Sequence, residues 1–554
     1  MRFSPRSTTA PAGAAAVPPP RERPLRSYSS YIGGRDVEGE GWVYTVSAGS
    51  LLEDVFTSIS LKRALERSPD PESAAARHPY VIGRVAMAGD AGVDAALKAA
   101  SAAAPAWAAV PLEQRMALGP LFRERLLRHR TELLDLMAAE GTPLRLARWQ
   151  LDGLLELYGE ESCAWYRQCM HTEFRHAGRR LLVHRQPDGV VCLNPPQNAP
   201  APSAALAVLM LMAGNSVVVR APRSIALSTM YLLRELAGPA LMEAGAPPGA
   251  LGAVCGNPGQ MITRWLDSPL VDDIFYVGGS EEGLRFQSRC IAAGKKPILE
   301  LAGNDGIVVW KDADLPYAAE AVAEAFYGSG QICMVPNYVL AHPDIADALL
   351  AEVTAKARDI RPGHPGDEDV LLTPVRRSER FFALLEEALH AGAELVCGGH
   401  RTEADGTRSP TGVFLEPTVV RVDGLAGARA LEMVRRETFF PLLPVVVAEP
   451  AADDVLLDRF LDFLNANAYG LRNSLWTRHT AVVDAFVRRV GNGGLLKVND
   501  SHIGFLPCLP SHGGTGLTGG VHGEANYPML TTSHLQGVGI SSGVSPRHAV
   551  FGER

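Results

Sequence analysis

The sequence lacks the features that mark several common classes of protein. None of its eight cysteines forms a CxxC pair, so zinc-finger and thioredoxin-like proteins find no support. The longest apolar run, residues 204–213, is far shorter than the roughly 20 residues of a membrane span. Basic residues are not in excess, because 53 Lys and Arg face 61 Asp and Glu. A nucleic-acid binder usually has a basic face, so the sequence predicts neither a nucleic-acid partner nor a membrane.

The composition that remains is typical of a large globular protein. Hydrophobic residues make up 47% of the 554 residues and charged residues 21%, which is ordinary for a chain with a sizeable core. A chain of this length predicts about three or four structural units. Unpaired cysteines in a long chain are typical of reduced thiols, so we expect a cytoplasmic protein.

The two ends of the chain differ from the region between them. Residues 1–28 are rich in Ala, Pro, Ser and Arg and contain no apolar segment of a secretory signal, which predicts a disordered tail. Residues 31–80 include a charged insertion, and we expect irregular structure there. Residues 531–554 are rich in Gly and Ser, which indicates an exposed arm.

The region between the ends changes from helices to alternating strands and helices. Apolar residues at helical spacing predict helices over 90–108, 111–140 and 143–166. A Pro-Asp-Gly turn at 187–189 predicts a hairpin of the strands 180–185 and 190–193. Runs of β-branched residues then alternate with helices, at 217–219, 274–277 and 307–310. This alternation is typical of parallel strands with crossover helices, and so of an α/β fold.

One cysteine lies in a segment that suits a nucleophile. Cys333 ends the segment GSGQIC, whose glycines, Gly328 and Gly330, free the backbone just ahead of the sulfur. Such a turn exposes the sulfur and directs a backbone N–H at the atom that the sulfur attacks. A free cysteine is usually a small buried hydrophobe, so this segment alone does not identify a catalytic thiol.

Two further segments carry groups that suit acid–base chemistry. Glu300 follows the apolar residues Ile298 and Leu299, so loss of solvent around it would raise its pKa and make it a general base. Asn198 lies between two prolines in PQNAP, and a rigidly held amide can donate to a developing oxyanion. Taken singly, Glu300 is better interpreted as an ordinary strand-end carboxylate in an ion pair, and Asn198 as an ordinary turn residue.

A glycine-rich turn suits a phosphate-bearing ligand. The segment YVGGSEEG joins a predicted strand to a predicted helix and contains Gly278, Gly279 and Gly283. Glycines at such a position let a pyrophosphate approach the backbone at the helix N-terminus. Many strand-to-helix turns look alike, so this signal is weak without the others.

In combination, these segments resemble the aldehyde dehydrogenase family. The matching pieces are a GQxC cysteine box, an ELAG glutamate box, a PxNxP loop, a GNxVVV strand at 214–219, an E-x-F-x-P segment with Glu437 and Phe439, and Tyr-Gly-Leu at 469–471. The segment SHGG at 511–514 lies where the family usually has PFGG. The resemblance extends from about residue 90 to 528 in the family's order.

The resemblance implies an α/β fold of three parts. A Rossmann-like coenzyme domain would comprise 30–165 and 186–299, and an α/β catalytic domain 300–520. A small β oligomerisation arm would comprise 166–185 and 521–554, after a disordered tail at 1–29. Homodimers or homotetramers are the family norm.

The resemblance also implies roles for the residues named above. Cys333 would attack the aldehyde, and its thiohemiacetal oxyanion would be held by Asn198 and the Cys333 backbone N–H. Glu300 would activate the water that releases the carboxylic acid. NAD or NADP would be the coenzyme, with Glu437 on the nicotinamide ribose and Phe439 near the nicotinamide, and no metal would be required.

The coenzyme positions depart from the family pattern. The Lys that usually follows the VVV strand is Arg220, which differs from Lys in its geometry. Many NAD-preferring members carry an acid three residues further on, where this chain has Arg223. An Arg suits a ribose 2′-phosphate, so NADP use is one hypothesis, and a solvent-facing Arg223 is the other.

The substrate pocket is also expected to be unusual. Gln197 and Ala199 flank the oxyanion Asn where many members have aromatic residues, and His512 replaces a Phe. Ile332 and Met334, on either side of Cys333, would complete the pocket. The loss of aromatic walls predicts a polar or bulky aldehyde as the substrate.

Two other functions remain open at this point. An acylating enzyme of the same family would pass the thioester to coenzyme A, but such members generally lack the glutamate that Glu300 represents. A catalytically inactive structural member would explain the altered pocket, but it would not explain why Cys333, Glu300, Asn198 and Glu437 are all present.

Overall fold

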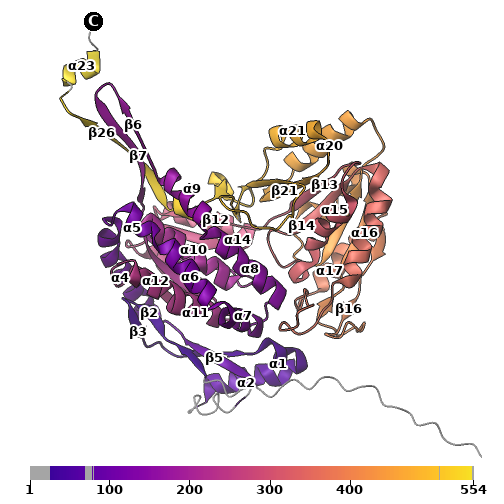
Figure 1. The fold of residues 1–554 in the computed structure, drawn as a ribbon. Coiled ribbons are helices and arrows are strands. Elements are labelled where there is room, and N and C mark those ends of the chain that lie inside the picture. The colour runs from indigo at the N-terminus through magenta and orange to yellow at the C-terminus, as the bar shows by residue number, and fades with distance from the viewer. Residues whose placement is uncertain (1–24, 69–77, 79, 511, 544, 552–554) are drawn as a thin grey trace, which may run out of the picture.

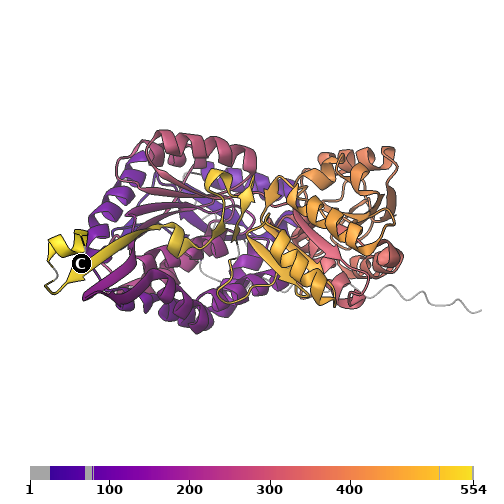
Figure 2. The same ribbon diagram turned by 90° about the horizontal axis from the view of Figure 1, so that it is seen from above.

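The computed structural model describes residues 25–68, 78, 80–510, 512–543 and 545–551. Two lobes lie side by side, and a long β arm projects from one of them (Figure 1). The view from above shows the same two lobes, with the C-terminal segment running between them and out along the arm (Figure 2). Most of the predicted tail at 1–29 lies outside the described residues, but residues 26–28 form strand β1, so the prediction is wrong there.

The first lobe is built on a seven-stranded sheet in the order β12-β11-β8-β9-β10-β2-β3. The five strands from β12 to β10 run parallel, and the last two, β2 and β3, pair antiparallel at one end of the sheet. The strands are β2 (Ser30–Ile32), β3 (Arg35–Val37), β8 (Val190–Asn194), β9 (Ser216–Ala221), β10 (Leu251–Cys255), β11 (Asp273–Val277) and β12 (Lys296–Glu300). The predicted strands at 217–219 and 274–277 are confirmed.

Helices cover both faces of this sheet because successive strand residues point to opposite sides. Val191 and Leu193 pack on one helix layer, while Val190 and Cys192 pack on the other. The helices of the first layer are α5 (Leu112–Met116), α6 (Leu118–Arg128), α7 (Arg130–Ala139), α8 (Leu144–Leu157), α9 (Glu160–Met170), α10 (Pro200–Ala213), α11 (Leu227–Tyr231), a π-helical segment (Leu232–Ala237) and α12 (Gly238–Glu243). The opposite layer holds α4 (Asp90–Ala108), α13 (Pro258–Asp267) and α14 (Ser280–Ala292).

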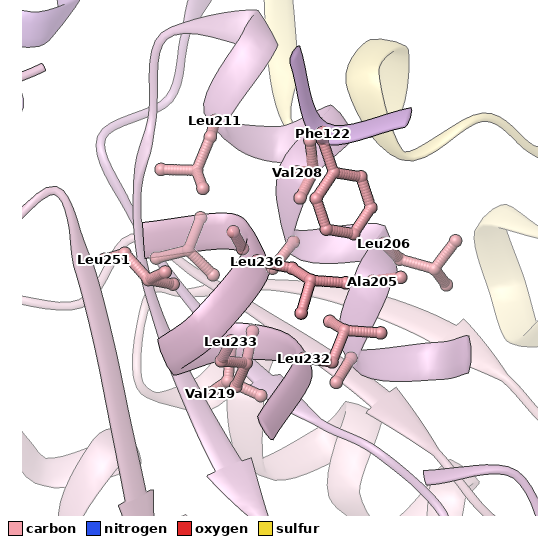
Figure 3. Packing of buried hydrophobic residues seen from close by; sticks show 14 of the residues in the cluster. Phe122, Ala205, Leu206, Val208, Leu211, Val219, Leu232, Leu233, Leu236 and Leu251 are labelled. Carbon is pink, nitrogen blue, oxygen red and sulfur yellow. The ribbon is translucent and has the colours of Figure 1, made fainter. Parts of the chain in front are cut away.

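Helix α10 is the centre of the core. All but one of its residues are buried, and Leu206, Val208 and Leu211 pack among leucines of the π-helical segment and Phe122 (Figure 3). This is the longest apolar run of the sequence, so its apolar character serves core packing. None of the described helices is long and apolar enough to cross a membrane.

The second lobe contains another seven-stranded sheet, in the order β15-β18-β19-β14-β13-β21-β22. All pairs are parallel except β15 with β18. The strands are β13 (Asp305–Val309), β14 (Pro336–Ala341), β15 (Glu394–Cys397), β18 (Thr418–Asp423), β19 (Leu442–Val447), β21 (Arg472–Trp476) and β22 (Leu495–Val498). Its helices are α15 (Leu315–Ala323), α16 (Ala346–Asp359), α17 (Glu379–His390), α18 (Leu425–Ala428), α19 (Glu432–Arg435), α20 (Asp453–Asn465) and α21 (Thr480–Arg489).

Two of the predicted helices are interrupted. The stretch 111–140 forms α5, α6 and α7. Pro120, in the first turn of α6, lacks the N–H that a helix continuous with α5 would need, and the second break lies at His129, where φ is −100° and ψ is 14°. The stretch 143–166 forms α8 and α9, separated at Gly159, whose backbone is extended with φ −68° and ψ 166°. The predicted helix at 90–108 is confirmed as α4.

The predicted hairpin of 180–185 and 190–193 is wrong. Strand β7 (Arg179–Pro187) pairs with β6 (His171–His176) and β26 (Ser533–Ser541), and these three strands form the projecting arm. Strand β8 pairs instead with β9 and β11. Gly189, at φ +134°, redirects the chain between two sheets, and β8, whose first four residues are apolar, is suited to burial on both faces.

The expectation of irregular structure over 31–80 is also wrong. Strand β4 (Trp42–Val46) pairs with β5 (Val81–Ala86), which also pairs with β1. Helices α1 (Ala48–Glu53) and α2 (Val55–Arg67) follow β4 and lie below the first lobe in Figure 1. Asp54 caps α2 by accepting a hydrogen bond from the Thr57 backbone N–H.

Candidate active site

A cavity of about 330 Å³ lies where the two sheets meet. Strand β12 ends at Glu300 and the chain enters β13 at Asp305, so only a short segment joins the sheets. Asn198, Gly278 and Glu300 reach the cavity from the carboxyl edge of the first sheet, and Cys333 and Phe439 from the amino edge of the second.

The topology of the first sheet explains the position of this cavity. The chain order runs from β8 outward through β9 and β10, then crosses back to β11 on the other side of β8. In open α/β sheets, ligands bind where the strand order reverses in this way. Asn198 follows β8 and Gly278 follows β11, so both residues lie at the reversal point.

Three consecutive left-handed residues direct the chain toward Cys333. Gly328, Ser329 and Gly330 have φ values of +60°, +56° and +70°. The Ser329 hydroxyl donates to the Thr373 carbonyl at 2.6 Å and accepts from the Thr373 N–H at 3.0 Å, which holds this costly conformation. A Cβ on Gly330 would collide with the Phe440 carbonyl, so glycine is required there.

Asn198 is held close to the cysteine segment. Its Nδ2 donates to the Gln331 carbonyl at 3.0 Å, and both Asn198 and Cys333 line the cavity. An amide nitrogen carries two N–H groups, so one can serve Gln331 while the other faces a substrate oxygen. The structure therefore brings together the three residues that the sequence singled out as catalytic.

Glu300 is buried against two residues that follow it by more than 200 positions. Asn526 Nδ2 donates to Glu300 Oε1 at 2.7 Å, and His512 Nδ1 lies 3.8 Å from Oε2. Burial raises the pKa of Glu300 to about 8, and the Asn526 hydrogen bond opposes this rise. Burial lowers the pKa of His512 to about 3, so its imidazole is neutral near pH 7.

The thiol and the second carboxyl group share this environment. Burial raises the pKa of Cys333 above its usual value, and the charges of Glu437 and Glu300 raise it further. Burial raises the pKa of Glu437 to about 8, and the Gly303 N–H donates to Glu437 Oε1 at 3.2 Å. A neutral thiol is a poor nucleophile, so Cys333 must lose its proton to act.

The glycine-rich turn fits a pyrophosphate. No side chain caps the N-terminus of α14, and a Cβ on Gly279 would meet no atom within 4 Å. The buried hydroxyl of Ser280 has no hydrogen-bond partner among the described residues. Free N–H groups, open space and an unpartnered hydroxyl at one helix end suit an anion. Gly283 does not line the cavity. A Cβ on Gly283 would collide with the Leu301 side chain, so this glycine serves packing between α14 and the segment after β12.

The two arginines occupy different settings. Arg220 is buried and its guanidinium donates to Asn194 Oδ1 at 2.6 Å and to the Pro195 carbonyl at 3.1 Å. It therefore fixes the loop that leads to Asn198. Arg223 is exposed at the carboxyl end of β9, and half-buried Lys62 of α2 lies within electrostatic range of it.

The substrate side of the cavity differs from the expectation. Ala199, Ile332, Met334 and His512 line it, whereas Gln197 is exposed and does not. Aromatic walls come instead from Trp149 of α8 and Phe505, with leucines around them. The cavity therefore has aromatic walls, contrary to the loss of such walls inferred from Gln197, Ala199 and His512. Nothing in the local sequence marks Trp149, Phe505 or Asn526, because each reaches the cavity through the tertiary fold.

The substitution Gly303→Ala is expected to damage activity more than folding. A Cβ there would collide with the Cys333 carbonyl, so the nucleophile would move. We expect the free energy of unfolding to fall by about 1–3 kcal/mol, and kcat to fall roughly 10²-fold. Thermal unfolding and aldehyde oxidation measure the two effects. Gly427→Ala, which would meet no atom within 4 Å, is the matched control, and equal effects would contradict the prediction.

A doubly wound sheet whose ligand edge faces a half-buried thiol and a buried carboxyl group is typical of a two-lobed, coenzyme-dependent α/β enzyme. The aldehyde dehydrogenase family model matches residues 68–533, and the chain belongs to this family. It is an NAD(P)-dependent oxidoreductase that acts on the aldehyde group. Among the described residues, no group of three or more His, Cys, Asp or Glu side chains is placed to hold a metal ion.

Individual relatives share this family and fold. The NADP-dependent succinate-semialdehyde dehydrogenase of Escherichia coli is 30% identical over 381 residues, which cover 67% of this chain and 76% of the relative. The NAD-dependent benzaldehyde dehydrogenase of Pseudomonas putida is 28% identical over 462 residues, covering 82% and 90%. An NAD-dependent aldehyde dehydrogenase from Sinorhizobium meliloti superposes with a TM-score of 0.79 at 23% identity, over 97% of this chain and 98% of that one.

Proposed function

We propose that this protein oxidises an aldehyde to the carboxylic acid through a covalent intermediate on Cys333. The observation that carries the proposal is that Cys333, Glu300 and Asn198 all open into one cavity. In this mechanism the Cys333 thiolate attacks the aldehyde carbon, and the carbonyl oxygen becomes an oxyanion. The Asn198 amide and the Cys333 backbone N–H donate to that oxyanion.

The coenzyme would lie along the carboxyl edge of the first sheet. The N-terminus of α14, with Gly278 and Gly279, would hold the pyrophosphate, while Glu437 would bind the nicotinamide ribose and Phe439 would pack near the ring. When bound, the nicotinamide supplies the acceptor for the hydride that leaves the thiohemiacetal carbon. The product on Cys333 is then a thioester.

Glu300 is proposed to complete the reaction with water. Its carboxylate would remove a proton from a water molecule, whose oxygen attacks the thioester carbon and releases the acid and the thiol. The alternative is transfer to coenzyme A, which does not need this base. Product analysis with and without coenzyme A separates the two outcomes, and an acyl-thiol product would overturn hydrolysis.

A panel of aldehydes assayed with NAD and NADP tests the whole proposal. We expect reduced nicotinamide to form in proportion to acid. Absence of turnover with every aldehyde would favour the catalytically inactive alternative. Two features around the thiol argue against that alternative. Gly303 packs closely on the Cys333 carbonyl, and Ser329 adopts a left-handed backbone conformation that costs free energy.

We propose a homodimer or homotetramer, assembled through the arm, in the cytoplasm. Strand β6 is exposed along its whole length. Apolar side chains are exposed on all three arm strands, namely Phe174, Val183, Leu535 and Ile540. Exposed apolar side chains on a projecting sheet are typical of an interaction surface. Sedimentation of the full chain measures the oligomeric state.

The substitution Arg223→Ser tests the preference for NADP. If the exposed guanidinium pairs with the 2′-phosphate, kcat/KM with NADP falls about tenfold. We expect kcat/KM with NAD to change by less than about threefold, because NAD has no phosphate for the guanidinium to pair with. Arg488→Ser, an exposed arginine of α21, is the control. Equal losses with both coenzymes, or a strong NAD preference of the native enzyme, would contradict 2′-phosphate recognition.

A further inference from the structure

The part of the cavity beyond Cys333 has an apolar wall drawn from three elements. Helix α8 contributes Gly153 and Leu154, helix α10 contributes Leu206, and the loop after β22 contributes Leu506 and Leu509. These elements belong to both lobes. A substrate body that enters here would leave water for hydrocarbon, which favours an apolar body.

The most specific feature of this wall is a pair of stacked aromatic rings. Trp149 and Phe505 have ring centroids 5.0 Å apart and an interplanar angle of 26°. Gly153 makes the stack possible, because a Cβ at that position would collide with the Phe505 ring. A stacked pair presents the outer faces and the edges of its rings, and another planar ring packs well against either.

The loop that carries Phe505 is fixed from behind. Lys497 Nζ donates to the Ser501 and Gly504 carbonyls, both at 2.7 Å. The carboxylate of buried Glu324 accepts from the Ser501 hydroxyl at 2.5 Å and from the Ile503 N–H at 2.9 Å. The ring surface is therefore rigid before a substrate arrives, which lowers the entropic cost of binding.

The charged groups of the cavity disfavour an aldehyde that carries a carboxylate. No Lys or Arg lies among the described residues that line it, and the acidic groups there are Glu300 and Glu437. His512 is neutral near pH 7 because burial lowers its pKa to about 3. An aldehyde with a remote carboxylate would lose water without gaining a cationic partner, which is costly.

From these observations we propose that the substrate is an aromatic aldehyde without a charged group, whose ring packs on the Trp149–Phe505 stack. The inference rests on the proposed function, since it assigns the substrate class of the same site. Catalysis needs only the Cys333 side of the cavity, whereas selection of the substrate needs the stack and the leucines.

Comparison of three aldehydes tests the proposal. We expect kcat/KM for benzaldehyde to exceed that for 4-oxobutanoate by at least about 10²-fold, with acetaldehyde between them. Phe505→Leu should lower kcat/KM for benzaldehyde about tenfold and leave that for acetaldehyde within about threefold. Comparable values for benzaldehyde and 4-oxobutanoate in the native enzyme would overturn the assignment.

A charge introduced at the mouth provides a gain-of-function test. Leu506 lines the cavity and is 43% exposed, so a longer polar side chain fits there without burial. Leu506→Arg should raise kcat/KM for 4-oxobutanoate about tenfold, because a carboxylate would then gain a partner. Leu506→Gln, which is polar but uncharged, should not. An equal gain in both variants would contradict the charge argument.

A binding measurement separates this proposal from the proposed function. Calorimetric titration of the Cys333→Ala variant with benzaldehyde and with 4-oxobutanoate requires no turnover. We expect benzaldehyde to bind at least about tenfold more tightly. If no aldehyde is oxidised but this preference holds, the proposed reaction fails and the pocket assignment stands. The reverse preference in binding would overturn the assignment even if aldehydes are oxidised.

Discussion

The Cys333→Ala variant is expected to lose aldehyde oxidation almost completely, with kcat/KM falling by at least about 10³-fold. The physical reason is that no other described side chain of the cavity is a nucleophile of comparable strength, and the covalent intermediate cannot form without the sulfur. The fold should tolerate the change, since alanine fits within the space of cysteine. The measurement is reduced-nicotinamide formation with benzaldehyde and acetaldehyde, alongside thermal unfolding.

A matched control distinguishes this effect from general damage to a thiol. Cys397 is also a half-buried free cysteine, but it lies on β15, away from the cavity. Cys397→Ala should retain full activity, and alkylation by iodoacetamide should abolish activity in the native enzyme and in this control alike. Substantial activity in Cys333→Ala would show that the catalytic assignment is mistaken.

The sequence predicts best those features that depend on local pattern. Short apolar runs that contain β-branched residues predict strands β9, β11 and β13, because such runs suit a parallel sheet covered on both faces. The glycines at 328 and 330 predict a turn before Cys333, because only glycine adopts left-handed φ values at little cost. These local signals were sufficient to place Cys333 at a turn and Gly279 at a helix start.

Features that depend on distant contacts were beyond the sequence patterns. The turn at Gly189 predicts a hairpin equally well whether the next strand returns or enters another sheet. The partner of β7 on that side is β26, which lies more than 340 positions further along the chain. Asn526 likewise bonds Glu300 across 226 positions. No periodicity of the chain carries such information, since each pairing joins segments that are far apart in the sequence.

The aromatic wall of the substrate cavity also depends on contacts between distant segments. Comparison of motif positions located the residues beside Asn198, and it predicted a polar or bulky aldehyde from Gln197, Ala199 and His512. The side chain of Gln197 is exposed, while Trp149 and Phe505 supply the aromatic surface from other elements. Pocket polarity is a property of all surfaces that converge on a site, so a single loop could not determine it.

The Glu300→Gln variant is expected to stop after one turnover. Glutamine keeps the size and hydrogen bonding of the side chain but cannot accept a proton from water. The first acylation of Cys333 should therefore proceed, while steady-state kcat falls about 10²- to 10⁴-fold. Rapid-mixing measurements should show a burst of one reduced coenzyme per site, and mass spectrometry should show an acyl group on Cys333. A variant that turns over normally would exclude Glu300 as the base.

The pH dependence of the native enzyme follows from the same carboxyl group. Only the ionised form accepts a proton, and burial raises the pKa of Glu300 to about 8. The rate of hydrolysis should therefore rise with pH and level off above about 8. The Glu300→Gln variant should not show this rise. The Asn526 hydrogen bond lowers the pKa of Glu300, so Asn526→Ala should move the midpoint to higher pH.

Thr531 provides a graded version of this test. Its hydroxyl donates to Asn526 Oδ1 at 3.0 Å and so orients the amide whose nitrogen reaches Glu300. Thr531→Val removes that hydroxyl without touching the carboxyl group, and the midpoint should move upward by less than in Asn526→Ala. A merely structural role for Asn526 would lower kcat at every pH without moving the midpoint. A rate that does not vary between pH 6.5 and 9 would instead mean that Glu300 does not limit hydrolysis.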